Sequence, residues 1–178
     1  MTATIGVGNG EPILRDARRE ISILITENEL TITLAHYAAG EHVAAAHVHH
    51  GHTDAFYVLE GELTFEIGSE NEAITAPSGT FVAVPPWLSH SFRNDGEGAA
   101  RWLTMHAHDG GFGAFMRGVR DGVDVEWDIG AVPADGGRSA GDAIVRRNIG
   151  SEWFEVGTQL CRLRGFPPDD CVVEWRRP

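Results

Sequence analysis

The sequence contains no lysine, and all 14 of its basic residues are arginine. Schiff-base chemistry and catalysis with pyridoxal phosphate both need a lysine amine, so this absence excludes both. Acidic residues outnumber basic ones by 26 to 14, which gives a formal net charge of −12. Because an acidic chain is not attracted to nucleic acid or to an anionic membrane surface, we expect neither as a partner.

Cysteine is also scarce, with only Cys161 and Cys171. They do not form a CxxC pair, so the sequence supports neither a zinc knuckle nor a thioredoxin-type motif. Two cysteines are too few for a disulfide scaffold, and we expect two free thiols, with a single bridge as the alternative. No run approaches the ~20 apolar residues that span a bilayer, and the N-terminal segment lacks the apolar stretch of a signal peptide. We therefore expect a cytoplasmic protein.

Short runs of alternating apolar and polar residues dominate the chain from Ile13 onward. Leu63, Phe65 and Ile67 alternate with polar neighbours, as expected of a strand that buries one face. Similar runs, separated by glycine, proline or asparagine, cover residues 29–37, 54–60, 79–87, 90–94, 100–108, 143–150, 158–165 and 171–177. Many short strands at regular spacing predict an all-β sandwich or barrel. Residues 1–12 are small and polar, and we expect a flexible start there.

One segment has helical spacing instead. Its apolar residues recur at i, i+3, i+4 and i+7, which is one face of a short helix. These residues are Phe112, Phe115, Met116 and Val119. Asp109 is a candidate cap at the start of this helix, and Gly122 is suited to its end.

The length of 178 residues fits one domain. Within residues 1–178 we expect a barrel core over 13–108, a short helix over 109–122 and a loop over 130–142. The strands of residues 143–178 are expected to pack on the barrel or on a partner subunit. Since open sheet edges need covering, we expect a homodimer.

Four of the nine histidines lie within residues 47–52. On a strand, His47 and His49 leave the same face, and a hairpin can bring Asp54 beside them. His90 can join them from a separate strand, whereas His42 and His50 are expected to be ordinary polar residues. Imidazole and carboxylate together suit divalent iron, manganese, nickel, cobalt, copper or zinc.

In these residues the sequence resembles the cupin family, whose motifs are G-x5-HxH-x3/4-E-x6-G and G-x5-PxG-xx-H-xxx-N. The matching residues are Gly40, His47, His49, Asp54 and Gly61, then Gly79, Pro85, Trp87, His90 and Asn94. The resemblance implies a jelly-roll barrel, also called a double-stranded β-helix, followed by a short helix and extra C-terminal strands. It also implies one divalent metal ion per chain, held by His47, His49, Asp54 and His90.

Three positions depart from the family pattern. Six residues rather than five separate Gly40 from His47, and Trp87 replaces a glycine. Asp54 stands where the family has glutamate, which shortens the reach of the carboxylate by ~1.3–1.5 Å. A metal–oxygen bond of ~2.0–2.2 Å tolerates little of such a gap. The strand could move inward, Asp54 could bind through water, or three histidines could leave the site more open. His52, in the loop, is a further alternative ligand.

Strand parity predicts the wall of a small-molecule pocket. The candidates are His36, Phe56, Val58, Trp87 and Phe92. His106 and His108 could transfer protons at the pocket mouth, but we expect them to be surface residues. Asp54 is the candidate catalytic group.

The resemblance extends to quercetinase-like cupins, in which a redox metal with open positions would let O2 react with an enol, catechol or flavonol. The leading hypothesis is therefore a metal-dependent dioxygenase. The alternatives are a non-catalytic, metal-dependent binding protein for a small metabolite, and a zinc-type lyase or cyclase.

Overall fold

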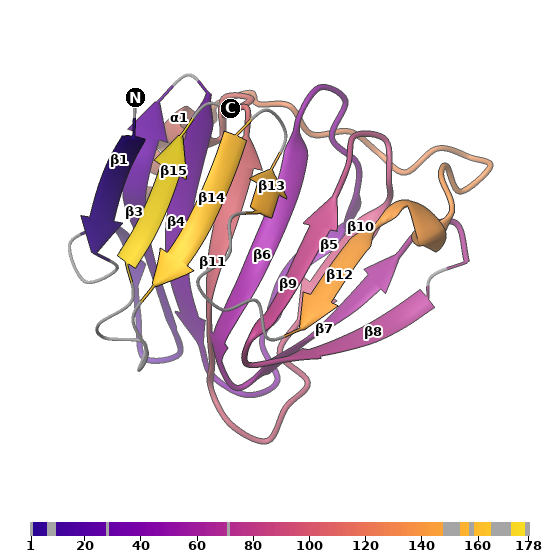
Figure 1. The fold of residues 1–178 in the computed structure, drawn as a ribbon, viewed down its shortest axis with the longest axis horizontal. Coiled ribbons are helices and arrows are strands. Elements are labelled where there is room, and N and C mark those ends of the chain that lie inside the picture. Colours follow the sequence, from indigo (N-terminus) through magenta and orange to yellow (C-terminus); the bar gives the residue numbers. More distant parts are fainter. Residues whose placement is uncertain are drawn as a thin grey trace.

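The computed structural model describes residues 2–6, 10–27, 29–70, 72–147, 154–156, 159–164 and 172–176. These residues form three antiparallel β-sheets and one α-helix (Figure 1). The largest sheet has the order β12 (Ile144–Arg147), β9 (Thr80–Val84), β6 (Thr53–Glu60), β11 (Ala100–Ala107), β4 (Leu30–Tyr37), β3 (Arg19–Glu27) and β2 (Glu11–Arg15). Among the described residues, no helix combines the length and apolar character needed to cross a membrane.

A four-stranded sheet faces the largest one and closes the barrel. Its order is β5 (His42–His47), β10 (His90–Arg93), β7 (Glu62–Ile67) and β8 (Glu72–Pro77). On β7, Leu63, Phe65 and Ile67 are fully buried, which confirms the predicted alternation. They pack against Phe56 of β6 and Phe92 of β10 in the core between the two sheets. Full burial of each such side chain stabilises the fold by about 1.5–3 kcal/mol.

A third sheet, drawn in front in Figure 1, covers the outer face of the largest sheet. Its order is β1 (Thr2–Gly6), β15 (Val172–Arg176), β14 (Gln159–Arg164) and β13 (Phe154–Val156), and β13 contacts β6 and β11. Tyr57 and Leu59 of β6 are buried on this side in a second core that includes Val156. Since β6 is buried on both faces, its sequence Ala55–Leu59 is continuously apolar rather than alternating.

The N-terminal expectation was wrong. Residues 2–6 are a strand that pairs with β15, because the terminal segments complete one sheet together. The strands predicted within residues 143–178 belong to two different sheets. β12 joins the edge of the largest sheet, and β13, β14 and β15 join β1. The pairing of Cys161 with Cys171 cannot be followed, since Cys171 lies outside the described residues.

The predicted helix is α1 (Phe112–Asp121), and it ends at Gly122 in the left-handed conformation as expected. Met116 is buried against Ile13 and Ile23, which fixes α1 on β2 and β3. The predicted loop over residues 130–142 is irregular except for a 3-10 turn at Ala140–Asp142.

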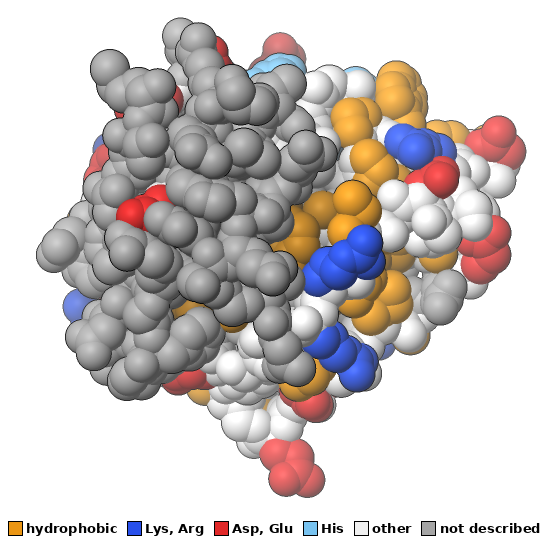
Figure 2. Space-filling view, viewed as in Figure 1, with side chains coloured by type: hydrophobic (Ala, Val, Ile, Leu, Met, Phe, Trp, Pro, Cys, Tyr) orange, Lys and Arg blue, Asp and Glu red, His pale blue; other side chains and the backbone are white. Residues whose placement is uncertain are grey.

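One face of the molecule shows hydrophobic side chains beside basic ones, over the region where Figure 1 places β12 (Figure 2). On this edge strand the Ile144 side chain is 46% exposed. The homodimer remains a prediction, and the edge of the largest sheet at β12 is where we expect an edge-strand contact.

Asp109 caps α1 from two residues before its first turn. Its carboxylate accepts hydrogen bonds from the backbone N–H of Gly111 at 3.0 Å and of Gly113 at 2.9 Å, and also bonds the Thr31 hydroxyl. Because these donors lose their acceptor, Asp109→Ala should lower the free energy of unfolding by about 1–2 kcal/mol. Chemical denaturation measures this loss. The exposed Asp124→Ala is the matched control, and an equal effect of both substitutions would contradict the capping role.

Candidate metal centre

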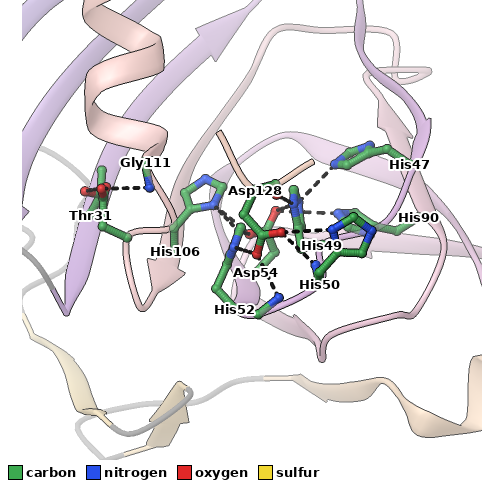
Figure 3. Close-up of polar contacts among 12 residues, drawn as sticks. Thr31, His47, His49, His50, His52, Asp54, His90, His106, Gly111 and Asp128 are labelled. Atoms are coloured by element: carbon green, nitrogen blue, oxygen red, sulfur yellow. Dashed lines mark hydrogen bonds and ion pairs between the residues drawn. The ribbon is translucent and has the colours of Figure 1, made fainter. Parts of the chain in front are cut away.

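The pairing of β5 with β10 brings two histidines from distant parts of the sequence together. His47 ends β5, His90 begins β10, and the two are direct partners in the ladder. Their rings lie 4.3 Å apart between centroids. Asp54 comes from β6 and His49 from the loop before it, and both side chains point at the same place (Figure 3).

Backbone carbonyls fix how the three rings present their nitrogens. The Nδ1 of His47 lies 2.7 Å from the Ala45 carbonyl, and the Nδ1 of His90 lies 3.1 Å from that of Leu88. His49 Nδ1 lies 2.5 Å from the backbone carbonyl of Asp128. A carbonyl oxygen only accepts, so Nδ1 carries the hydrogen in each ring and Nε2 faces the cluster. This is the orientation in which metal-ligating histidines are usually held.

The facing atoms have the spacing of metal ligands. His49 Nε2 lies 3.1 Å from His47 Nε2 and 3.1 Å from Asp54 Oδ2, and His90 Nε2 lies 3.5 Å from that oxygen. Two ligand atoms about 2.1 Å from one ion are about 3.0–3.4 Å apart at ordinary coordination angles. The shorter carboxylate of Asp54 therefore lies within the cluster despite the missing methylene. Its direct ligation of a metal remains a prediction.

His90 supplies a further test of fit. Its Nε2 is buried and has no hydrogen-bond partner in the described part of the chain. An unpaired buried polar atom costs about 1–3 kcal/mol, and a metal ion would provide the missing partner. All four side chains are buried, and together they form a mixed imidazole and carboxylate set. These residues thus fit a divalent transition metal.

A second pair of histidines contacts the other oxygen of Asp54. His106 Nδ1 lies 2.6 Å and His52 Nε2 lies 3.1 Å from Asp54 Oδ1. The expectation that His106 is a surface residue was wrong, because it is only 2% exposed. It pairs with Asp54 across the β6–β11 ladder, where the sheet is covered on both faces. His108 is exposed, as expected.

Asp128 was missed in the sequence, and it organises the whole loop of residues 49–52. Its carboxylate accepts from the backbone N–H of His50 at 2.9 Å and of Gly51 at 2.8 Å. The same carboxylate lies 2.8 Å from His52 Nδ1, and the Asp128 backbone carbonyl holds His49. No motif spacing or alternation marks this position, which lies 76 residues after His52.

Both carboxylates are ionised at neutral pH. Burial would raise the pKa of Asp54, but the charge and hydrogen bond of His106, with those of His49 and His52, hold it well below its usual value. Burial also acts to raise the pKa of Asp128, yet the backbone donors of His50 and Gly51, with His52, lower it to about 2. The ion pairs found for these two carboxylates are all with histidines.

The pKa values of His47 and His49 are shifted in opposite directions. Burial lowers the pKa of His47 to about 4, so this ring is neutral at pH 7 and ready to act as a ligand. Burial would also lower the pKa of His49, but its hydrogen bond to Asp54 and the charge of that carboxylate raise it. A metal ion would have to displace any proton held there.

A cavity of about 510 Å³ opens onto His47, Asp54 and His106. Apolar side chains dominate its wall, and seven of them are aromatic. They are Tyr37, Phe56, Phe92, Trp102, Phe112, Phe115 and Trp127. Pockets of ~300–1,000 Å³ with apolar walls typically take small organic ligands.

Only some of the predicted pocket residues line this cavity. Phe56 and Phe92 line the cavity, whereas Val58 is buried in the barrel core. Trp87 is 50% exposed and contacts His50 with tilted rings, whose centroids lie 4.4 Å apart.

His36 lines a separate hollow of about 320 Å³ with Glu20 and Arg101. The cavity side of β4 carries Thr33 and Ala35 instead. The apolar side of β4 packs in the second core, under the third sheet, which strand parity could not reveal.

Acidification should destabilise the metal-free protein between about pH 6.5 and pH 4. The pKa of His47 is 6.5 in the unfolded chain and about 4 when folded, so the unfolded state binds more protons in this window. The expected loss is about 2–3 kcal/mol, at about 1.4 kcal/mol per pKa unit. The raised pKa of His49 acts in the opposite direction, but only above pH 6.5.

Urea unfolding in the presence of a chelator, repeated at several pH values, measures this slope. His47→Gln should reduce it between pH 6.5 and pH 4, where the lowered pKa of buried His106 retains part of the slope. An unchanged slope in this variant would contradict the assignment to His47.

A family model described as a cupin domain matches residues 33–106, which span every clustered histidine and Asp54. A search of curated proteins found no match. One similar solved structure is a predicted oxalate decarboxylase from Thermotoga maritima, with 18% identity, a TM-score of 0.51, and coverage of 58% of this chain and 97% of that one. KdgF from Halomonas sp. shows 16% identity and a TM-score of 0.48, with coverage of 55% of this chain and 84% of that one. An RmlC-like cupin from Shewanella frigidimarina shows 17% identity and a TM-score of 0.48, with coverage of 57% of this chain and 86% of that one. The match to the family model shows that residues 33–106 form a cupin domain.

Proposed function

We propose that this cupin is a metal-dependent dioxygenase that acts on an enol, catechol or flavonol-like substrate. One observation carries the proposal: the buried cluster of His47, His49, Asp54 and His90 meets an aromatic cavity of about 510 Å³. A structural metal site is usually closed by protein ligands, whereas a catalytic one opens onto a pocket.

A bound redox metal would supply a Lewis acid and an electron-transfer centre at the cavity wall. The protein side chains would do the rest. Phe56, Phe92 and Trp127 offer flat apolar surfaces to a planar ring, and they exclude water from it. Thr33, Tyr37 and Thr104 carry the hydroxyl groups of the wall. Arg19 also lines the cavity, where it would attract an enolate.

Asp54 is the candidate catalytic group of this site. Its carboxylate is ionised, and Oδ1 is already held by His52 and His106. Oδ2 faces the other histidines, and it would accept a hydrogen bond from a substrate hydroxyl.

Removal of one ligand should remove metal. In His90→Ala the metal content should fall by one ion per chain. The substitution removes the unpaired Nε2 of His90, and the three remaining ligand atoms should bind the ion too weakly to retain it. Elemental analysis of purified protein, loaded and then desalted, measures this content. The exposed His42→Ala is the control and should match the wild type. Equal metal content in both variants would contradict a metal at this cluster.

Oxygen uptake tests the reaction itself. Protein loaded with Fe(II), Mn(II), Ni(II) or Co(II) should consume O2 in the presence of catechols or flavonols, and the chelated protein should not. Because the ring must enter the aromatic cavity, Phe56→Ala should reduce uptake at low substrate more than at saturation. No uptake with any metal would sink the proposal. Substrate binding without uptake would favour a metal-dependent binding protein, and a requirement for zinc would favour lyase or cyclase chemistry.

A further inference from the structure

We propose that a second divalent ion binds on the far side of Asp54, held by His52 Nε2, Asp54 Oδ1 and His106 Nδ1. The Asp54 carboxylate would then bridge two ions, one for each oxygen. This inference concerns the number of metal ions and does not depend on the dioxygenase reaction. It replaces the single ion expected from the sequence by a two-ion centre.

The spacing of this second cluster resembles that of the first except for one shorter contact. The atoms are 2.6 Å apart for Asp54 Oδ1 and His106 Nδ1, 3.1 Å for Asp54 Oδ1 and His52 Nε2, and 3.2 Å for the two nitrogens. In the first cluster the corresponding contacts measure 3.1, 3.1 and 3.5 Å. All three residues of the second cluster are at most 3% exposed. Such mixed nitrogen and oxygen sets suit the same metals as the first cluster.

The hydrogens around His52 also favour a cation. Its Nδ1 lies 2.8 Å from Asp128 Oδ2, which can only accept, so Nδ1 carries the hydrogen. Nε2 of the same ring faces Asp54 Oδ1 at 3.1 Å, and this oxygen is another acceptor. The nearby His106 Nδ1 has at most one hydrogen to share between them. A metal ion would give all three atoms a partner at once, in a carboxylate–histidine–metal arrangement.

His106 adds a second, independent observation. Its Nε2 is buried without a hydrogen-bond partner in the described part of the chain, and it lies on the ring edge away from Asp54 (Figure 3). If Nδ1 binds the metal, Nε2 must carry the hydrogen. Because His106 lines the aromatic cavity, this N–H would be a donor to an anionic ligand there.

Charge balance predicts the order of binding. The site holds two carboxylates, Asp54 and Asp128, whose formal charges match one divalent ion. A second ion adds two positive charges to a buried site, so we expect it to bind more weakly than the first and to be favoured by an anionic ligand. Extensive dialysis should therefore remove the second ion first.

Metal stoichiometry tests the proposal. Wild-type protein saturated with Co(II) or Mn(II) and briefly desalted should hold two ions per chain. His52→Ala and His106→Ala should each hold one, and His90→Ala should also hold one. The combination His90→Ala with His106→Ala should hold none, because neither cluster is then complete. The exposed His108→Ala, only two residues from His106, is the matched control and should hold two.

A spectroscopic readout does not depend on any variant. Two Mn(II) ions bridged by one carboxylate should give an exchange-coupled electron paramagnetic resonance spectrum at full loading and an uncoupled one at half loading. One ion per chain in the saturated wild type would overturn the proposal. So would two uncoupled ions, or two ions that persist in both His52→Ala and His106→Ala. These outcomes differ from failure of the dioxygenase proposal, which is read from oxygen uptake alone.

Discussion

The site depends on one buried carboxylate held between two groups of imidazoles. Asp54 is 3% exposed, and its two oxygens face different histidines, His49 and His90 on one side and His52 and His106 on the other. Burial of an ion without a partner would cost several kcal/mol, so the carboxylate is stable there only because these rings, or metal ions between them, compensate it. The buried carboxylate and the imidazoles of the cluster therefore stabilise one another.

The surrounding fold buries this cluster. β6, which carries Asp54, lies under the barrel core on one face and under the third sheet on the other. α1 closes the cavity from a further side, with Phe112 stacked on His106 at 3.6 Å between ring centroids. In such a low-dielectric environment each charge–charge and charge–metal interaction is stronger than in water. The terminal strands thus affect the electrostatics of a site that they do not contact. The helix has the same effect and contacts the site only through apolar rings.

The sequence was sufficient for the parts that follow from local pattern or motif. Alternation predicted β7, helical spacing predicted α1, and the two motifs identified the four residues that the structure brings together around Asp54 Oδ2. It failed where long-range covering decides the outcome. His106 looked like a strand end at the surface, and His36 was placed on the cavity side of β4, because nothing local shows that a third sheet covers this face. Asp128 was missed since a loop residue acquires its partners only from the tertiary fold.

Asp128 explains why the histidines of residues 49–52 point in different directions. Its backbone carbonyl orients His49 toward one oxygen of Asp54, and its carboxylate orients His52 toward the other. The same carboxylate binds the backbone of His50 and Gly51, which turns the His50 ring outward onto Trp87. A loop that supplies ligands to two neighbouring positions must hold its rings in fixed tautomers, since each Nε2 needs a free lone pair. One aspartate outside both motifs meets this requirement for both rings, so the division of histidines between the two sides of Asp54 is set by the tertiary fold rather than by the spacing of the motif.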